Sequence, residues 1–431
     1  MRYRQSAGLL EKLAVAPSRS SRFPTILAPL RIPPFGRLLS SYTINELGDS
    51  IAVVALAVLV YDQTGDPLAT TALFVAARFI PAFLAPVLTA RLDQLALRRV
   101  LPAIYVIEAV SFIALALLAE SFLLVAVLAL ALLDGTLAVT ARGLSRSAVA
   151  AVLKPREELR RGNALINVGF AVSSVGGAAL GGALVSVGSV QVALLVDAVT
   201  FAGAAIIIAG ARDLPGESAE REPFGLRLRE GLAYASRHPF VRLLYVAQAL
   251  ALVFFTLIVP IEVVYAKESL DAGDAGFGLL LASWGAGIVI GSLLFAAIHS
   301  RATIALVVLS SAAVGVAYLG MAAAGTLAVA CALSVLGGAG NGVQWVSVMT
   351  LLQEHTPQDL QARAAGLLES VAAAMPGVGF VLGGVLTAVS SPRTAYAVAG
   401  GGVLVVVAIV PLVAWRSRRS FRDAQPVGSG R

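Results

Sequence analysis

The chain alternates between long apolar blocks and short polar connectors. Each block has close to twenty residues or more, which is the length that a helix needs to cross about 30 Å of hydrocarbon. The pattern predicts an all-α polytopic membrane protein with twelve transmembrane helices. The predicted spans are residues 38–61, 68–89, 100–118, 122–144, 159–187, 190–209, 240–265, 277–299, 303–323, 327–352, 365–389 and 395–415.

The composition agrees with a membrane protein. Hydrophobic residues make up 58% of the 431 residues, charged residues make up 13%, and the mean hydropathy is +0.86. Soluble domains are roughly half apolar and a quarter charged, so a soluble enzyme is excluded as a class. The only cysteine, Cys331, lies inside an apolar block, so we expect no disulfide. We expect no cofactor and no metal site either.

The distribution of positive charge predicts how the chain is oriented in the membrane. The net charge is +7, and all but three of the 32 Lys and Arg residues lie in connectors and tails on one side. The exceptions are Arg78 inside a span, and Lys267 and Arg393 on the opposite side. By the positive-inside rule both termini are cytoplasmic, in a cell inner membrane. Basic connectors of this kind face anionic lipid, so nucleic acid is not an expected partner.

One long polar connector divides the chain into two sets of six spans. The expected organisation is a cytoplasmic tail (1–34), an N-terminal six-helix bundle (35–211), a linker (212–238), a C-terminal six-helix bundle (239–416) and a second tail (417–431). Residues 224–236 place apolar residues at helical spacing among charged ones, which predicts a helix on the membrane surface.

An internal repeat relates the two sets of spans. A constant shift of 202 residues superposes an ordered set of matching residues, which chance does not readily produce. The repeat predicts two bundles related by a pseudo-two-fold axis, with a binding site between them. The matches are Pro155 with Pro357, Arg161 with Arg363, Leu165 with Leu367, Gly177 with Gly379, and Gly181 and Gly182 with Gly383 and Gly384.

Four stretches resemble the major facilitator superfamily, and in particular its drug-efflux branch, which includes macrolide exporters and the enterobactin exporter. They are residues 47–65, 154–165, 228–244 and 340–367. The resemblance implies export of small amphiphilic organic molecules, such as a drug, an antibiotic or a siderophore-like compound. It also implies alternating access coupled to proton influx. The expected partners are the cargo, the proton and the lipid bilayer, and a monomer is expected.

The superfamily's signature between spans two and three is present in a degenerate form. Asp93, Arg98 and Arg99 match it, whereas Gln94 and Ala96 replace expected residues. The resemblance implies a cytoplasmic gate in which Asp93 pairs with a base such as Arg142 on a neighbouring helix. Arg161 and Arg363, which the repeat relates, are assigned to the same gate. The alternative is an ordinary solvated, charged loop.

The antiporter signature of span five is altered as well. It reads Gly177 to Gly182 with Ala178 in place of the usual proline. Gly177 and Gly181 form a small-xxx-small face that lets two helix backbones approach closely. Packing is therefore the favoured interpretation of these glycines, and the missing proline weakens the case for antiport.

Charged residues inside spans are expensive in hydrocarbon, so each one predicts a partner or a function. Glu46 and Asp49 lie on one face of span one, and such an acid pair can bind and release protons. Arg78 in span two is a candidate partner for Asp49, and Asp134 in span four is a further candidate. The predicted proton-coupling residues are Glu46, Asp49, Arg78 and Asp134, with a static ion pair as an equally weighted alternative.

Two other acids lie inside spans. The resemblance places Glu108 beside the cavity and Asp197 at the periphery, where a structural role is expected. It also implies that spans one, four, seven and ten line a central cavity. For each cavity residue taken singly, helix packing is the alternative. The predicted cavity residues are Asn45, Gln248, Phe254, Phe255, Asn341, Gln344 and Trp345.

Other functions of a polytopic membrane protein remain open. Within the same fold, a lysolipid flippase or a solute uptake permease is the alternative to an exporter. From another class, a non-transporting membrane sensor or scaffold is possible, although the repeat favours a site between two halves. An enzyme is not expected, because His238, His299 and His355 lie near connectors and no nucleophile with a base stands out.

Overall fold

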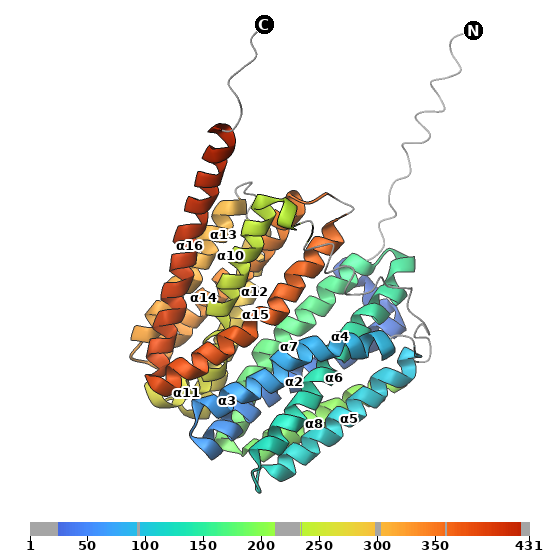
Figure 1. The fold of residues 1–431 in the computed structure, drawn as a ribbon. Coiled ribbons are helices and arrows are strands. Elements are labelled where there is room, and N and C mark those ends of the chain that lie inside the picture. The colour runs from blue at the N-terminus through green and yellow to red at the C-terminus, as the bar shows by residue number, and fades with distance from the viewer. Residues whose placement is uncertain are drawn as a thin grey trace, which may run out of the picture.

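The computed structural model describes residues 25–92, 95–211, 233, 235–297, 303–357 and 360–423, and all its regular elements are helical (Figure 1). Twelve helices are long and apolar enough to cross a membrane. The elements of the N-terminal half are η1 (Thr25–Arg31), α2 (Pro33–Thr64), α3 (Pro67–Phe74), η2 (Val75–Phe79), α4 (Ile80–Leu92), α5 (Leu97–Leu118), α6 (Leu124–Leu153), η3 (Lys154–Arg156), α7 (Leu159–Val187) and α8 (Val190–Ala209).

The C-terminal half follows the same order of spans. Its elements are α10 (Pro239–Thr256), η4 (Val259–Ile261), α11 (Glu262–Val264), η5 (Tyr265–Ser269), α12 (Gly273–Ala297), α13 (Thr303–Ala323), α14 (Leu327–Glu354), α15 (Gln361–Val389) and α16 (Pro392–Asp423). The prediction of twelve spans is confirmed. The fold is the all-α polytopic one that the apolar blocks predict.

Most span boundaries agree with the apolar pattern, and the exceptions have physical causes. Spans five, six and nine begin and end at the predicted residues. Helix α6 continues to Leu153, beyond the predicted end at residue 144, because a helix can extend past the apolar block that crosses the membrane. The second span is interrupted by a π turn, η2, and the seventh span ends in another, η5. Apolar periodicity registers neither of them.

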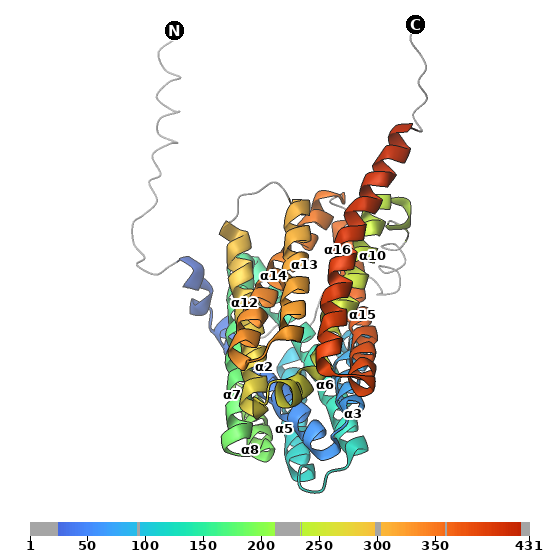
Figure 2. The ribbon, with the colours of Figure 1, turned by 90° about the vertical axis from the view of Figure 1, so that its left-hand side faces the viewer.

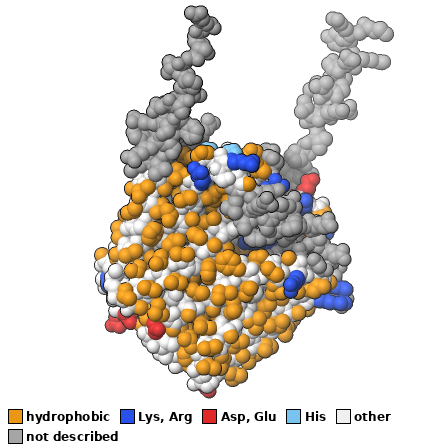
Figure 3. Space-filling model, in the orientation of Figure 1, with side chains coloured by type: hydrophobic (Ala, Val, Ile, Leu, Met, Phe, Trp, Pro, Cys, Tyr) orange, Lys and Arg blue, Asp and Glu red, His pale blue; other side chains and the backbone are white. Residues whose placement is uncertain are grey.

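The described chain begins and ends on the same side of the molecule (Figures 1 and 2). We call the side where α2 begins and α16 ends the tail side, and the opposite side the far side. Hydrophobic side chains cover much of the flank in Figure 3. A membrane protein presents such a surface to lipid, which explains why large apolar residues such as Val187, Val199 and Ile206 are exposed.

Glycines allow the helices of each half to pack closely, and the contacts repeat with the 202-residue shift. Helices α7 and α15 have bounds that differ by this shift at both ends. A Cβ at Gly177 would lie 2.5 Å from Cβ of Ser50 on α2, and one at Gly379 would lie 2.4 Å from the Val253 carbonyl oxygen on α10. The packing interpretation of these glycines is therefore confirmed.

Gly182 and Gly384, which the repeat also relates, pack against the other half of the molecule. A Cβ at Gly182 on α7 would lie 2.9 Å from Cα of Gly278 on α12, and one at Gly384 on α15 would lie 2.0 Å from Oγ1 of Thr71 on α3. Phe74 and Phe380 meet across the same boundary in an edge-on contact with ring centroids 6.0 Å apart. The halves thus interlock along α7 with α12 and α3 with α15.

Polar contacts join the halves at the far side. Lys267 in η5 forms ion pairs with Asp62 at the end of α2 and, at 2.7 Å, with Asp274 on α12. Next to it, the Tyr61 hydroxyl donates a hydrogen bond to the Glu268 carboxylate. Among the described residues, the polar contacts between the two halves lie at this end. The molecule is in a conformer whose far side is closed.

Candidate functional site

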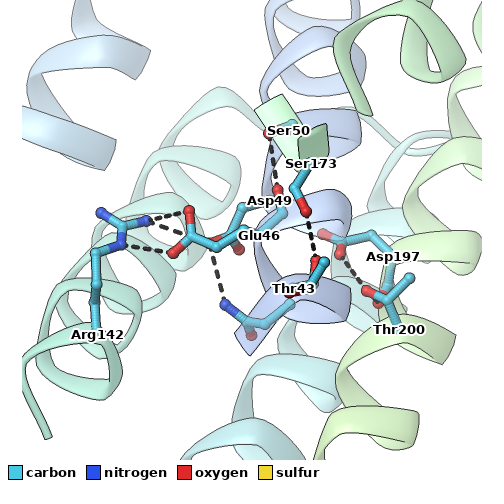
Figure 4. Close-up of polar contacts among 9 residues, drawn as sticks. Thr43, Glu46, Asp49, Ser50, Arg142, Ser173, Asp197 and Thr200 are labelled. Atoms are coloured by element: carbon cyan, nitrogen blue, oxygen red, sulfur yellow. Dashed lines mark hydrogen bonds and ion pairs between the residues drawn. The ribbon is translucent and has the colours of Figure 1, made fainter. Parts of the chain in front are cut away.

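A buried ion pair links α2 to α6 in the N-terminal half. Arg142 donates two hydrogen bonds to the Glu46 carboxylate, from Nε at 2.7 Å and from Nη2 at 3.2 Å, as Figure 4 shows. The Glu46 side chain is only 4% exposed, whereas the Arg142 side chain is 33% exposed. A bidentate, charge-assisted pair of this kind has a defined geometry and is stronger than a hydrogen bond between neutral groups.

A second acid competes for the same arginine. Asp49, one helical turn from Glu46, has its Oδ2 3.6 Å from Nη2 of Arg142, and the same oxygen accepts a hydrogen bond from the Asn45 amide at 3.3 Å. The other Asp49 oxygen is buried without a partner among the described residues. Arg142 therefore holds two carboxylates unequally, with Glu46 closely bound and Asp49 at the limit of ion pairing.

The back of α2 is fixed to α7 and α8. Ser173 of α7 donates a hydrogen bond to the Thr43 carbonyl at 2.7 Å, and Asp197 of α8 accepts one from Thr200 at 2.9 Å (Figure 4). Gly48 lets this side chain approach, because a Cβ there would lie 1.9 Å from Oδ1 of Asp197. Helix α2 is thus held on one face and carries its acids on the other.

Arg78 lies in the π turn η2, where each helical turn contains one extra residue. Its side chain is exposed and sits over the ring of Phe74, with 6.0 Å from Cζ to the ring centroid. Its charge interacts with those of Asp49 and Glu46. The predicted direct pair between Asp49 and Arg78 is replaced by a pair with Arg142, because α6 places that guanidinium closer to the acids.

Two further acids of the N-terminal half lie beyond the ion pair. Asp134 on α6 is half-buried, and its charge interacts with those of Asp49 and Arg142. Glu108 on α5 is fully buried, and its charge interacts with that of Asp134. Away from the ends of its spans, the N-terminal half contains the acids Glu46, Asp49, Glu108, Asp134 and Asp197 and the bases Arg78 and Arg142.

The C-terminal half contains a bridge at the corresponding place. Gln344 on α14 donates a hydrogen bond from Nε2 to Oε1 of Gln248 on α10 at 2.6 Å, and both residues are 2% exposed. The shift of 202 residues maps Glu46 onto Gln248 and Arg142 onto Gln344, and each bridge joins residues 96 positions apart. The ion pair of one half is thus an amide pair in the other.

This amide pair does not match the predicted position in a cavity between the halves. Gln248 and Gln344 line a small pocket of about 60 Å³ inside the C-terminal half, between α10, α13, α14 and α16. Their neighbours in the pocket are apolar apart from Ser311. Hydrogen bonding between helices, the alternative for these residues, describes their position better.

The other predicted cavity residues also have packing roles. A Cβ at Gly402 on α16 would lie 2.2 Å from the Phe254 ring, so that ring packs within its own half. Phe255 is 6% exposed in the core, and Trp345 packs against the cluster that contains Tyr245 and Leu352. Asn45 bridges to Asp49, and Asn341 is half-buried on α14.

The predicted gate on the tail side has a different arrangement. Arg142 is engaged with Glu46 and Asp49, deeper in the span than the gate would require. Arg161 pairs within its own helix turn with Glu158 at 2.7 Å, and Arg98 and Arg99 are exposed at the start of α5. Arg363 is half-buried, and Asp93 lies outside the described residues, as does most of the predicted surface helix.

The far-side contacts could not be read from the sequence, although Lys267 was expected on that side. No partner was assigned to this lysine, although acids flank it in the sequence at Glu268, Asp271 and Asp274. The partner in the other half, Asp62, is 205 residues away, so no local pattern reveals it.

Comparison with known proteins decides the family. The sequence profile described as transmembrane secretion effector matches residues 24–426 of the chain. The chain belongs to this family. It is a member of the major facilitator superfamily, and its fold is that of membrane transporters rather than enzymes. A search of curated proteins found no match.

Solved structures of superfamily transporters resemble the fold of this member. The nucleoside transporter NupG matches with a TM-score of 0.70 and 11% identity over 88% of this chain and 98% of its own. The POT family transporter PepTSo matches at 0.72 and 11% over 91% and 99%. A bacterial homologue of the human lysosomal transporter Spinster, solved inward-facing and unoccupied, matches at 0.64 and 13% over 93% and 100%. At such identities the likeness concerns the fold alone.

Proposed function

We propose that the chain is a secondary active transporter that exports small amphiphilic organic molecules by alternating access, driven by proton influx. The observation that carries the proposal is the buried Glu46–Arg142 ion pair. A carboxylate bound to a guanidinium inside a membrane span is costly, so such a pair is a candidate for a functional role, and reversible proton binding is one such role. The transporter fold of the family supports the choice of class.

The proposed step is an exchange of partners at Arg142. When Glu46 gains a proton its charge is lost, the bidentate pair weakens, and Arg142 can move toward Asp49, which already lies 3.6 Å away. Because Glu46 belongs to α2 and Arg142 to α6, the exchange changes how two helices of one half are held together. This is a local switch that can bias rocking of that half against the other.

The closed far side indicates which step of the proposed transport cycle this conformer represents. If the tail side is cytoplasmic, as the positive-inside rule predicts, the molecule is inward-facing and ready to take cargo from the cytoplasm. Breaking the Lys267–Asp62 pair and the Tyr61–Glu268 hydrogen bond would open the far side for release. A proton entering from there would reach the acids of α2 and drive the return.

Uptake remains the alternative direction, and one experiment tests both direction and coupling. Everted membrane vesicles expose the tail side, and their interior is acidified before the lipophilic cation ethidium is added outside. Export coupled to protons predicts that the dye accumulates inside, and that Glu46→Gln removes this accumulation. The matched control is Glu369→Gln, which neutralises an exposed acid on α15.

The outcomes separate the alternatives. Equal accumulation by Glu46→Gln and the unmodified chain would contradict proton coupling at this site. Dye loss from preloaded vesicles, driven by the same gradient, would favour an uptake permease. If the dye does not move with or without a gradient, the assay is repeated with a panel of antibiotics and lysolipids. Binding of lysolipids would then favour the flippase, and binding of other compounds without transport would favour the non-transporting sensor or scaffold.

A further inference from the structure

Glu108, in the middle of α5, is the buried acid that the proposed switch does not use. Its side chain is fully buried, and neither carboxyl oxygen has a hydrogen-bond partner among the described residues. Asp197, which is equally buried, differs because the Thr200 hydroxyl binds one of its oxygens. Of the acids inside the N-terminal spans, Glu108 is the one whose two oxygens are both buried without a hydrogen-bond partner.

The charges that face Glu108 come from every neighbouring helix. Helix α6 contributes Asp134 and Arg142, α8 contributes Asp197, and α2 contributes Asp49. The charges of three acids and a single base therefore act on a carboxyl group that has no hydrogen-bond partner among the described residues. Moving an ionised carboxylate from water into such surroundings costs several kcal/mol even after the protein relaxes. Binding a proton removes that cost.

A line of acids connects this position to the ion pair. Asp134 interacts with Glu108 on one side and with Asp49 and Arg142 on the other. Gly135, beside Asp134, allows α6 to approach the π turn, because a Cβ there would lie 2.0 Å from the Ala77 carbonyl oxygen next to Arg78. The acids thus extend from α2 through α6 to α5 across the interior of one half.

We propose that Glu108, with Asp134 beside it, forms a second proton-binding site in the N-terminal half, separate from the Glu46–Arg142 pair. A metal ion is not the favoured occupant, because no group of three acids, histidines or cysteines in the described ranges is arranged to hold one. The site accepts a proton while the far side is open and releases it toward the tail side when Glu46 loses its proton and Arg142 pairs with it again. Its part in transport rests on the proposed function, whereas proton binding itself does not.

The consequence is a larger number of protons per cargo molecule. The Glu46 site alone would exchange one proton in each cycle, and the second site adds another. The second site is also out of reach of cargo, because Glu108 is fully enclosed by helices. Proton binding there can therefore proceed whether or not the cargo site is filled.

Infrared difference spectroscopy tests proton binding directly. The full chain in lipid is titrated from acidic to alkaline pH, and the C=O stretching band of protonated carboxylic acids is followed. We expect Glu108→Gln to lose one component of this band, and the unmodified chain to lose the same component reversibly as the pH rises. Glu262→Gln, which replaces a buried acid of the C-terminal half, is the matched control and should leave that component unchanged.

Two results would overturn the proposal. Identical spectra for Glu108→Gln and the unmodified chain would mean that Glu108 carries no proton. A component that persists at every pH at which the protein stays folded would mean a permanently neutral, structural acid. Folding of each variant is checked by its elution as a single species and by its helical circular dichroism.

A transport measurement tests whether Glu108 takes part in proton coupling. In proteoliposomes, the membrane potential that just balances a fixed pH gradient during ethidium transport gives the number of protons per dye molecule. Glu108→Gln should lower this number by one while Glu46→Gln abolishes coupling. If Glu46→Gln has no effect and the infrared component still titrates, the proposed function fails and the proton site stands. An unchanged number in Glu108→Gln overturns the role of Glu108 in coupling.

Discussion

The two halves of the molecule carry the same bridge in two chemical forms. In the N-terminal half an ion pair joins α2 to α6 through Glu46 and Arg142, and in the C-terminal half an amide pair joins α10 to α14 through Gln248 and Gln344. The positions are related by the 202-residue repeat. The two halves therefore carry a polar bridge at equivalent positions, and only the N-terminal bridge is charged.

The surroundings of the two bridges differ in polarity, as the bridges themselves do. The ion pair has further acids nearby, at Asp49, Asp134 and Glu108, whereas the amide pair borders an apolar pocket. Amides do not titrate, so the C-terminal bridge keeps its form at every pH. The comparison teaches that the N-terminal bridge contains a group that can bind a proton, whereas the C-terminal bridge contains none.

Removing the arginine should have the largest effect. Arg142→Ala leaves Glu46 and Asp49 buried without their base, and breaking a buried pair from one side costs about 3–5 kcal/mol. We expect a loss of this size in the free energy of unfolding in detergent, together with a loss of ethidium transport. Arg146→Ala, an exposed arginine one turn further along α6, is the control. If Arg142→Ala were as stable as Arg146→Ala, the ion pair would not stabilise the fold, and the comparison between the two bridges would fail.

Breaking the amide bridge should cost less. Gln344→Ala leaves the Gln248 amide buried and unpaired, which destabilises the protein by about 1–3 kcal/mol. Proton-driven transport should keep its dependence on the pH gradient, since no charge is involved. The double variant Gln248→Leu with Gln344→Leu removes both amides and should recover most of the stability. Loss of gradient dependence in either variant would show that the C-terminal bridge is not a passive link.

Converting one bridge into the other sharpens the comparison further. The double variant Glu46→Gln with Arg142→Gln gives the N-terminal half the amide pair of its counterpart. Its free energy of unfolding should stay within about 1–2 kcal/mol of the original, because both charges leave together. Transport should become insensitive to the pH gradient. If the free energy of unfolding fell as far as in Arg142→Ala, the backbones of the two halves would not hold an amide pair in the same way.

The smallest effect is expected away from both bridges. Lys267→Met removes the far-side ion pairs, whose partly exposed members contribute about 1 kcal/mol at most. That amount corresponds to about a fivefold shift toward the conformer with an open far side. Spin labels at Val187 and Val389, both exposed on the far side, would report a longer distance in a Cys331→Ser background. An unchanged distance distribution would contradict the proposed lock.

Much of the fold could be predicted from the chain because the membrane imposes a simple rule on helix length. The apolar blocks located spans five, six and nine to the residue, since turn-forming Gly188 and Ser189 and the capping Thr326 lie between them and their neighbours. The π turns η2 and η5 could not be predicted, because a π turn keeps the apolar composition of the helix and changes only its hydrogen bonds.

The candidate site was predicted in part. Glu46, Asp49 and Asp134 were predicted as proton-coupling residues because acids inside spans are rare. Asp197 was expected to have a structural role because its span is peripheral in the superfamily. Arg142 was assigned to the gate, because its distance from the end of the apolar block suggested the surface and not the depth that α6 gives it. The equivalence of the two bridges was present in the repeat, but it becomes visible only when the contacts of Glu46 are known.

The glycine contacts between the halves have a consequence for the speed and cost of opening. Where Gly182 faces Gly278, backbone meets backbone, and no side chain has to be ordered when the surfaces come together. Ordering a long side chain costs up to about 2 kcal/mol of rotamer entropy, and glycine has none to lose. Closing this seam is therefore cheap in entropy, so modest changes in ion pairing can decide on which side the molecule stands open.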